Sequence, residues 1–86
     1  MIMLEDRSSR IDHDRLIWPQ VAGDIEAEVA AGHLAPGSRL PTEDELAEVY
    51  GVARNTVRRA VEDLRDRGVL ETFHGRGTYV ARTPGG

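Results

Sequence analysis

The sequence contains no cysteine and no lysine, and only 5% of its 86 residues are aromatic. Without cysteine the chain has neither a disulfide framework nor a thiolate metal site, which suits a reducing cytoplasm. No stretch approaches the ~20 apolar residues of a membrane span. Acids interrupt the N-terminal MIMLEDRSSR, where a signal peptide needs an apolar run. We therefore expect one small cytoplasmic domain that is not exported and that folds around an apolar core.

The three histidines do not indicate an enzyme. His13, His33 and His74 are far apart in the chain, and none has a nucleophile or a further ligand at a spacing typical of catalysis. The run Asp12-His13-Asp14 is expected to be a solvated turn, since three adjacent residues rarely converge on one ion. We predict no catalytic activity, no metal site and no cofactor.

Charge is distributed unevenly along the chain, whose formal net charge is −4. Residues 1–53 hold four arginines and eleven acids, a balance of −7, whereas residues 54–86 hold seven arginines and four acids, a balance of +3. A basic face on an acidic body can still bind phosphate, because salt screens charges beyond ~8–10 Å. Arginine also suits both phosphates and base edges. Composition is thus compatible with a nucleic-acid partner bound in a strongly salt-dependent manner.

Residues 52–68, VARNTVRRAVEDLRDRG, form a predicted helix with two unlike faces. One face is an apolar stripe at helical spacing, made by Val57, Ala60, Val61 and Leu64. The first turns of the other side carry Arg54, Asn55, Arg58 and Arg59. Arginine pairs bidentately with guanine and asparagine with adenine in the major groove of DNA, as a recognition helix requires. On this stretch alone, a surface helix whose arginines face water is an equally good interpretation.

The segments before this helix indicate a helix-turn-helix. Residues 16–32 carry apolar side chains at helical spacing. Residues 42–45 (TEDE) are a capping box, in which the Thr42 hydroxyl accepts a hydrogen bond from the Glu45 amide and the Glu45 carboxylate reaches back. Only residues 51–53 separate the short helix that follows from the predicted recognition helix. A three-residue turn containing glycine is typical of a helix-turn-helix.

The residues after the predicted recognition helix indicate a β-hairpin. Residues 69–73 (VLETF) and 78–81 (TYVA) alternate as strands do, and residues 74–77 (HGRG) are expected to be the tip. A hairpin directly after a recognition helix is called a wing, and Arg76 is placed to enter the minor groove. As bare sequence, a glycine-rich turn with one arginine is a weak signal. Residues 38–40 are expected to add one short strand.

These segments predict a single domain over residues 16–82. Its class is α+β and mainly α, a winged helix-turn-helix of three helices plus a C-terminal β-hairpin, with the helix-turn-helix at about 43–62 and the wing at about 69–82. Residues 1–15 are polar and acidic without a sustained apolar period, so we expect a disordered or loosely attached arm. Residues 83–86 are expected to be a tail.

The order of these motifs resembles the DNA-binding domain of the GntR family of bacterial transcription regulators. The resemblance covers about residues 16–82 and is carried by PGSRLPTEDELA, by RNTVRRA in the third predicted helix and by GRGTYVA in the hairpin. It implies a sequence-specific regulator of transcription, which we predict to be a repressor. The implied partner is double-stranded operator DNA, palindromic and bound by a homodimer.

The resemblance also implies which positions contact DNA. In the third helix these are Arg54, Asn55, Thr56, Arg58 and Arg59. The wing tip, which enters the minor groove, contributes His74, Gly75 and Arg76. The start of the second helix, where free amides approach a phosphate, contributes Thr42 and Glu43.

Two positions depart from the family pattern. Asp44 stands where members commonly carry a basic residue that contacts DNA, so we expect the second helix to contribute little beyond its backbone amides. Ala53 stands where members usually carry a Ser or Thr N-cap, which leaves the cap unmade at a cost of about 1 kcal/mol.

Two questions stay open from the sequence. Family members normally continue into an effector-binding and dimerising domain, so the 86 residues are expected to be a stand-alone domain or a fragment of a longer regulator, and nothing in them indicates an effector pocket. The alternative function is a winged helix that binds protein without specific DNA binding, which the acidic first half favours.

Overall fold

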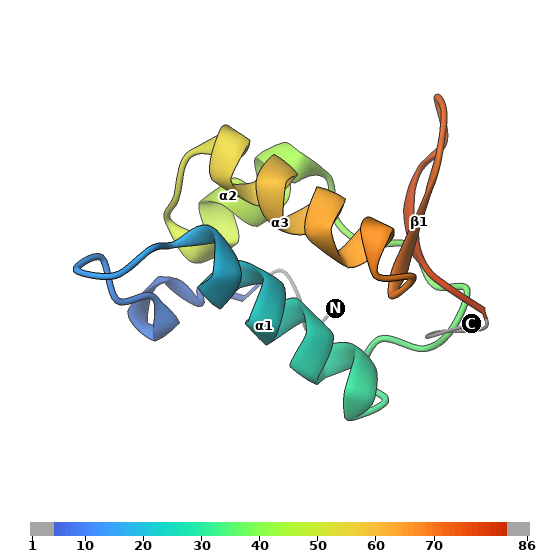
Figure 1. Cartoon of the computed structure of the whole chain (residues 1–86), viewed down its shortest axis with the longest axis horizontal. Coiled ribbons are helices and arrows are strands. Elements are labelled where there is room, and N and C mark those ends of the chain that lie inside the picture. The colour runs from blue at the N-terminus through green and yellow to red at the C-terminus, as the bar shows by residue number, and fades with distance from the viewer. Residues whose placement is uncertain (1–4, 83–86) are drawn as a thin grey trace.

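The structure, a computed structural model, describes residues 5–82 of the chain. Within this range three α-helices are followed by a β-hairpin (Figure 1). The elements in chain order are a 3-10 helix η2 (Ser8–Arg10), α1 (Trp18–Ala30), α2 (Glu43–Tyr50), α3 (Arg54–Asp66), β1 (Leu70–Phe73) and β2 (Gly77–Val80). The predicted class and architecture, a winged helix-turn-helix, are therefore confirmed.

The first helix, α1, packs along α3 (Figure 1). Its Pro19 lies in the first turn, where a missing amide costs no intrahelical hydrogen bond. The helix begins two residues later than the pattern from Leu16 predicts. Its inward side is made by Val21, Ala22 and Ile25, all buried.

The predicted capping box at the start of α2 is present. The Thr42 hydroxyl accepts a hydrogen bond from the Glu45 amide at 3.1 Å, and the Thr42 amide donates to the Glu45 carboxylate at 2.9 Å. The helix ends at Gly51, whose φ of 63° is left-handed and easily adopted by glycine. After this turn α3 begins behind Ala53, which makes no side-chain cap bond, as expected.

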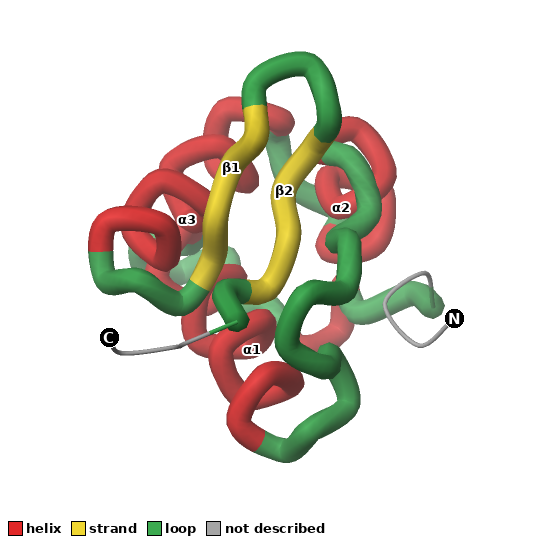
Figure 2. The backbone as a smooth tube through the Cα atoms, turned by 90° about the vertical axis from the view of Figure 1, so that its right-hand side faces the viewer, coloured by secondary structure: helices red, strands yellow, loops and turns green. Residues whose placement is uncertain are grey.

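The hairpin strands are antiparallel, with Leu70 opposite Val80 and Phe73 opposite Gly77. Leu70 and Val80 are buried at the end nearest the helices, and this anchors the hairpin to the core. Figure 2 shows the loop between the strands projecting beyond the helices.

Residues 38–40 run beside β2 and pair with it at one β-bridge, between Arg39 and Tyr79. The Leu40 amide donates a hydrogen bond of 2.8 Å to the Thr78 carbonyl next to this bridge. The predicted short strand is present only as a single bridge, because the following proline has no amide with which to continue the ladder.

The hydrophobic core is formed by all three helices and the hairpin. Its most completely buried side chains include Val21, Ile25, Leu46, Tyr50, Val57, Leu64, Leu70 and Val80. The apolar stripe predicted for α3 is buried throughout. Because that stripe fixes the rotation of α3 about its axis, it also fixes which of its side chains face solvent.

Residues 5–15 differ from the loosely attached arm that the sequence indicates; residues 1–4 and 83–86 lie outside the described range. Ile11 is part of the hydrophobic core, and Arg7 is 1% exposed. A short 3-10 turn separates these two anchors. For residues 5–15 the expectation of a loosely attached arm was wrong. Two single residues, Arg7 and Ile11, attach this segment to the domain, and two single residues produce no periodic pattern from which the attachment could be predicted.

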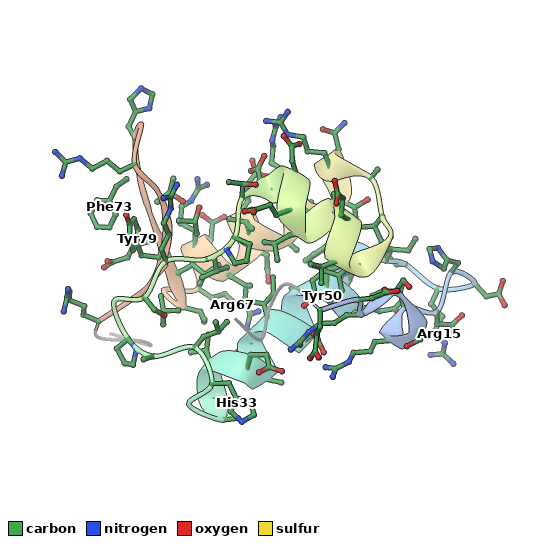
Figure 3. All side chains as sticks on the ribbon, turned by 180° about the vertical axis from the view of Figure 1, so that it is seen from behind. Arg15, His33, Tyr50, Arg67, Phe73 and Tyr79 are labelled. Carbon is green, nitrogen blue, oxygen red and sulfur yellow. The ribbon has the colours of Figure 1, made fainter. Side chains whose placement is uncertain are left out.

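Arg7 is the centre of a charged network that ties this segment to α1 and α2. Its guanidinium donates to Asp24 at 2.7 Å and to Glu28 at 2.9 Å, and its amide donates to the Val49 carbonyl at 2.7 Å. The Tyr50 hydroxyl donates to the same Asp24 carboxylate at 2.6 Å. Figure 3 shows Tyr50 pointing into this region. Three segments thus share one partly buried carboxylate.

The network shifts the acidity of its members. Burial alone would raise the pKa of Asp24, but hydrogen bonds from Tyr50 and Arg7 hold that pKa below its ordinary value. Burial opposes the shift at Glu28 too, where hydrogen bonds from His33 and Arg7 lower the pKa. Burial and the neighbouring Asp24 raise the pKa of Tyr50. Both carboxylates are therefore ionised at neutral pH and hold Arg7 in place.

Candidate nucleic-acid interface

The exposed side of α3 carries the side chains expected to contact DNA. Arg54, Asn55, Arg58 and Arg59 are exposed, and Thr56 is half-buried. They occupy the first two turns of the helix, directly after the turn at residues 51–53. Because Val57 and Ala60 are wholly buried between them, the polar side chains cannot rotate into the core.

A groove of about 840 Å³ separates the start of α2 and the exposed side of α3 from the hairpin. Seven of the ten predicted contact residues line it: Thr42, Glu43, Arg54, Arg58, His74, Gly75 and Arg76. Four arginines from three segments face this one hollow, namely Arg39, Arg54, Arg58 and Arg76. An anionic, elongated ligand fits such a groove, since positive charge inside a concave surface attracts phosphate.

Glu43 lies between the two groove arginines of α3. Its Oε1 is 3.4 Å from Nε of Arg54 and 3.4 Å from both Nε and Nη2 of Arg58. Asp44 shares Arg54, with 3.4 Å between its Oδ1 and the Arg54 Nε. The first turn of α2 therefore holds both guanidinium groups near the groove, and Asp44 adds a second acid where the family pattern has a base.

The other three predicted residues of α3 lie on its opposite flank. Asn55, Thr56 and Arg59 line a separate hollow together with residues 15–18. There the Arg59 guanidinium stacks on the ring of Trp18, 4.5 Å from its centroid. The helical rotation of about 100° per residue separates these side chains from Arg54 and Arg58. The five predicted residues of α3 thus lie on two flanks of that helix rather than in a single pocket.

The tip of the hairpin is a tight turn. The Arg76 amide donates a hydrogen bond of 2.8 Å to the Phe73 carbonyl, and Gly75 adopts a φ of 76°. On the hairpin, the rings of Phe73 and Tyr79 meet edge to face with 5.6 Å between centroids (Figure 3). These contacts stiffen the tip, so that His74 and Arg76 are presented by a defined turn.

Arg39 is a groove residue that the sequence argument missed. It lies in the connector between α1 and α2, where the only signal was a basic residue inside PGSRLP. Its place in the groove depends on the bridge to Tyr79, a pairing across 40 residues of chain. Such a long-range contact leaves no local pattern in the sequence.

Two other features are absent from residues 5–82. This range contains no group of three or more His, Cys, Asp or Glu side chains placed to hold a metal ion. None of its helices is long and apolar enough to cross a membrane.

Comparison with known proteins identifies the fold. The profile of the bacterial regulatory proteins of the gntR family matches residues 19–80. The chain belongs to this family. The match runs from the second residue of α1 through the helix-turn-helix to the last residue of β2.

Related gntR-type sequences are transcriptional repressors by name. The mannosyl-D-glycerate transport/metabolism system repressor MngR of Escherichia coli is 44% identical over 64 residues, which make up 74% of this chain and 27% of MngR. The HTH-type transcriptional repressor YtrA of Bacillus subtilis is 35% identical over 81 residues, 94% of this chain and 58% of YtrA. The chain therefore spans about a quarter of one relative and less than two thirds of the other.

Solved structures share the same architecture. A crystal structure of AraR(DBD) in complex with an operator has a TM-score of 0.72 and 39% sequence identity, covering 74% of this chain and 77% of AraR(DBD). A GntR family transcriptional regulator from Listeria monocytogenes has a TM-score of 0.81 and 27% identity, covering 85% of this chain and 64% of that protein. The family is regulatory rather than enzymatic.

Proposed function

We propose that this gntR-family domain binds operator DNA sequence-specifically and represses transcription. The observation that carries the proposal is the groove in which Arg54 and Arg58 of α3 face the hairpin tip with Arg76. The operator complex of AraR(DBD), 39% identical to this chain, supports DNA as the ligand. The names of MngR and YtrA support repression.

The exposed arginines in the first turns of α3 support this helix as the one that enters the major groove of DNA. A helix in that groove brings its first turns to the base edges. Arg54 and Arg58 then exchange Glu43 for guanine O6 and N7, which accept two hydrogen bonds from one guanidinium. Asn55 and Arg59, on the opposite flank of the helix, then face the opposite wall of the DNA major groove.

The remaining groove residues reach the DNA on either side of α3. The first turn of α2 offers the free amides that follow Thr42 to a phosphate. The hairpin tip enters the neighbouring minor groove, where Arg76 meets the negative potential of a narrow groove. His74 and Gly75 form the rest of the inserted turn.

One domain supplies one recognition helix and therefore one half-site. We infer that two copies bind a palindromic operator. The contact between the two copies then sets the distance between the half-sites on the DNA. A regulator of chromosomal operators acts in the cytoplasm, which is where we place this protein.

Selection of duplexes from a random pool tests the proposal. The wild-type domain is expected to enrich one short motif at a stated salt concentration, with affinity that falls steeply as salt rises. Enrichment of paired, inverted half-sites supports the dimer, and a single half-site overturns it. No enrichment, together with equal weak binding to all duplexes, overturns sequence-specific binding and favours a protein-binding winged helix.

A further inference from the structure

Arg39 extends along the hairpin toward its tip. Its backbone is bridged to Tyr79, yet its side chain reaches Gly77, two residues nearer the tip. A methyl group added to Gly77 would come within 2.8 Å of the Arg39 Nε and 3.3 Å of its Nη2. The guanidinium is therefore packed on the bare backbone where β2 begins.

Gly77 makes this contact possible in two ways. Its φ of 116° is a conformation that residues with side chains rarely adopt. Its lack of a side chain leaves the space that the Arg39 guanidinium occupies. The backbone of the hairpin at Gly77 thus holds the Arg39 guanidinium at the edge of the groove.

The charge of Arg39 is not neutralised within residues 5–82. No carboxylate of this range lies within 4.0 Å of its guanidinium, whereas Arg54 and Arg58 both pair with Glu43. Arg39 is exposed and lines the same groove as these two arginines. An anion reaching the groove can bind Arg39 without first displacing an acid.

We propose that Arg39 is a further DNA-contacting residue, which binds a backbone phosphate at the edge of the minor groove that the hairpin tip enters. The inference rests on the proposed DNA binding and assigns a contact beyond the ten residues that the family pattern implies. A phosphate is the expected ligand because Arg39 packs at Gly77, further from the hairpin tip than residues 74–76. When the tip enters the minor groove, residues 74–76 reach the base edges and Arg39 lies beside the DNA backbone.

A phosphate contact has a signature that a packing role lacks. Loss of one phosphate contact lowers the slope of log K against log salt by about 0.9, and it weakens binding to every sequence alike. The chain offers a matched control in Arg82. Its guanidinium also packs on a glycine, with 3.0 Å between its Cζ and a methyl group added to Gly37, but it lines a second, smaller hollow and not the groove.

The experiment measures binding of two duplexes over a salt series. One duplex carries the motif selected by the wild-type domain, and the other is a scrambled duplex of equal length and composition. Arg39→Gln is expected to lower the salt slope by about 0.9 and to weaken binding to both duplexes by roughly five- to tenfold. Arg39→Lys keeps the positive charge and should retain the slope, and Arg82→Gln should match the wild type.

Three results overturn the inference. They are an unchanged slope for Arg39→Gln, an equal fall for Arg82→Gln, and a fall for Arg39→Lys as large as that for Arg39→Gln, which would show packing on Gly77 to be the cause. In the unsubstituted protein, the Nε–Hε NMR signal of Arg39 should shift when either duplex is added. An unmoved signal while the amides of α3 shift also overturns it, even if Arg39→Gln is too unstable to purify.

The two proposals fail separately. If the wild-type domain enriches no motif but binds an arbitrary duplex from the random pool with a salt slope that depends on Arg39, sequence-specific binding fails and the phosphate contact stands. If a motif is enriched and Arg39→Gln binds like the wild type, sequence-specific binding stands and the Arg39 phosphate contact fails.

Discussion

Glu43 determines how the two groove arginines of α3 behave before DNA is bound. One of its two carboxylate oxygens, Oε1, lies 3.4 Å from the Nε of each arginine, and the arginine side chains are 57% and 48% exposed. Exposed ion pairs of this kind contribute about 0–1 kcal/mol. A bidentate pairing with the correct guanine contributes ~1–3 kcal/mol of discrimination. The exchange from Glu43 to guanine is therefore favourable at the right base pair and close to neutral at a wrong one.

Replacing Arg58 by alanine should show this discrimination. Arg58→Ala is expected to weaken binding to the selected duplex by about 1–3 kcal/mol and to relax preference at one base pair. The matched control is Arg65→Ala, in the last turn of α3, where Arg65 pairs with Asp66 at 3.6 Å outside the groove. Competition binding with single-base variants of the duplex measures both. Equal losses for the two variants would contradict the assignment of Arg58 to bases.

The missing cap of α3 can be supplied by one hydroxyl. Ala53 already has the extended conformation of an N-cap residue, with φ of −68° and ψ of 148°. Ala53→Ser should therefore raise the free energy of unfolding by about 0.5–1 kcal/mol, because the serine oxygen accepts an orphan amide of the first turn. Urea denaturation measures the change. Ala27→Ser, at an exposed position in the second half of α1, is the control and should lower stability slightly; a loss at both positions would refute the capping argument.

At the scale of elements, the sequence predicts those helices and turns that depend on contacts between residues close together in the chain. The capping box at Thr42, the turn at Gly51 and the apolar stripe of α3 all depend on neighbours within a few residues, so the helix-turn-helix was predictable. The pairing of residues 38–40 with β2 and the docking of residues 5–11 depend on partners far away in sequence. Arg7 meets Asp24 and Glu28 at separations of 17 and 21 residues. An isolated arginine in a polar stretch gives no indication of such a partner.

For the candidate site, the sequence predicts which residues line the groove better than it predicts how they are arranged around α3. The family resemblance named the arginines of α3 and the hairpin tip, and seven of its ten residues line the groove. It did not indicate which of them face the hairpin: burial of Val57 sets the rotation of α3, which turns Arg54 and Arg58 toward the groove and leaves Asn55 and Arg59 on the other flank. Whether each of the ten contacts DNA stays a prediction.

The N-terminal segment should contribute strongly to stability through Arg7. Arg7→Ala leaves the carboxylates of Asp24 and Glu28 without their buried partner, so we expect a loss of about 3 kcal/mol or more. Arg10→Ala removes a second arginine from the same Asp24, but that arginine is 48% exposed, so the expected loss is under about 1 kcal/mol. Chemical denaturation followed by circular dichroism compares the two. Similar small losses for both variants would contradict a structural role for the segment.

At the scale of the whole molecule, the acid network predicts how stability depends on pH. The folded-state pKa values of Asp24 and Glu28 lie below their ordinary values of 3.8 and 4.5. Their contribution is therefore complete above about pH 4.5 and is lost as pH falls through the lowered folded-state values. The raised pKa of Tyr50 acts in the opposite direction, with stability lost as pH rises above its ordinary value of 10.0.

Thermal melting across pH checks this prediction. The melting temperature should be flat between about pH 5 and 9 and fall on both sides. Asp24→Asn should flatten the acid side of the curve, whereas Asp14→Asn, an exposed acid outside the network, should leave it unchanged. An acid limb that is the same in all three proteins would show that other carboxylates control it.

The docking of Arg7 and Ile11 sets where this module can be cut for protein engineering. A chimaeric regulator made by joining the module to a foreign sensor would naturally start at residue 19, where the family profile begins. That junction discards the guanidinium that neutralises Asp24 and Glu28 and an isoleucine of the core. A transplant that starts at residue 5 keeps both, so the portable unit begins earlier in the chain than the family profile does.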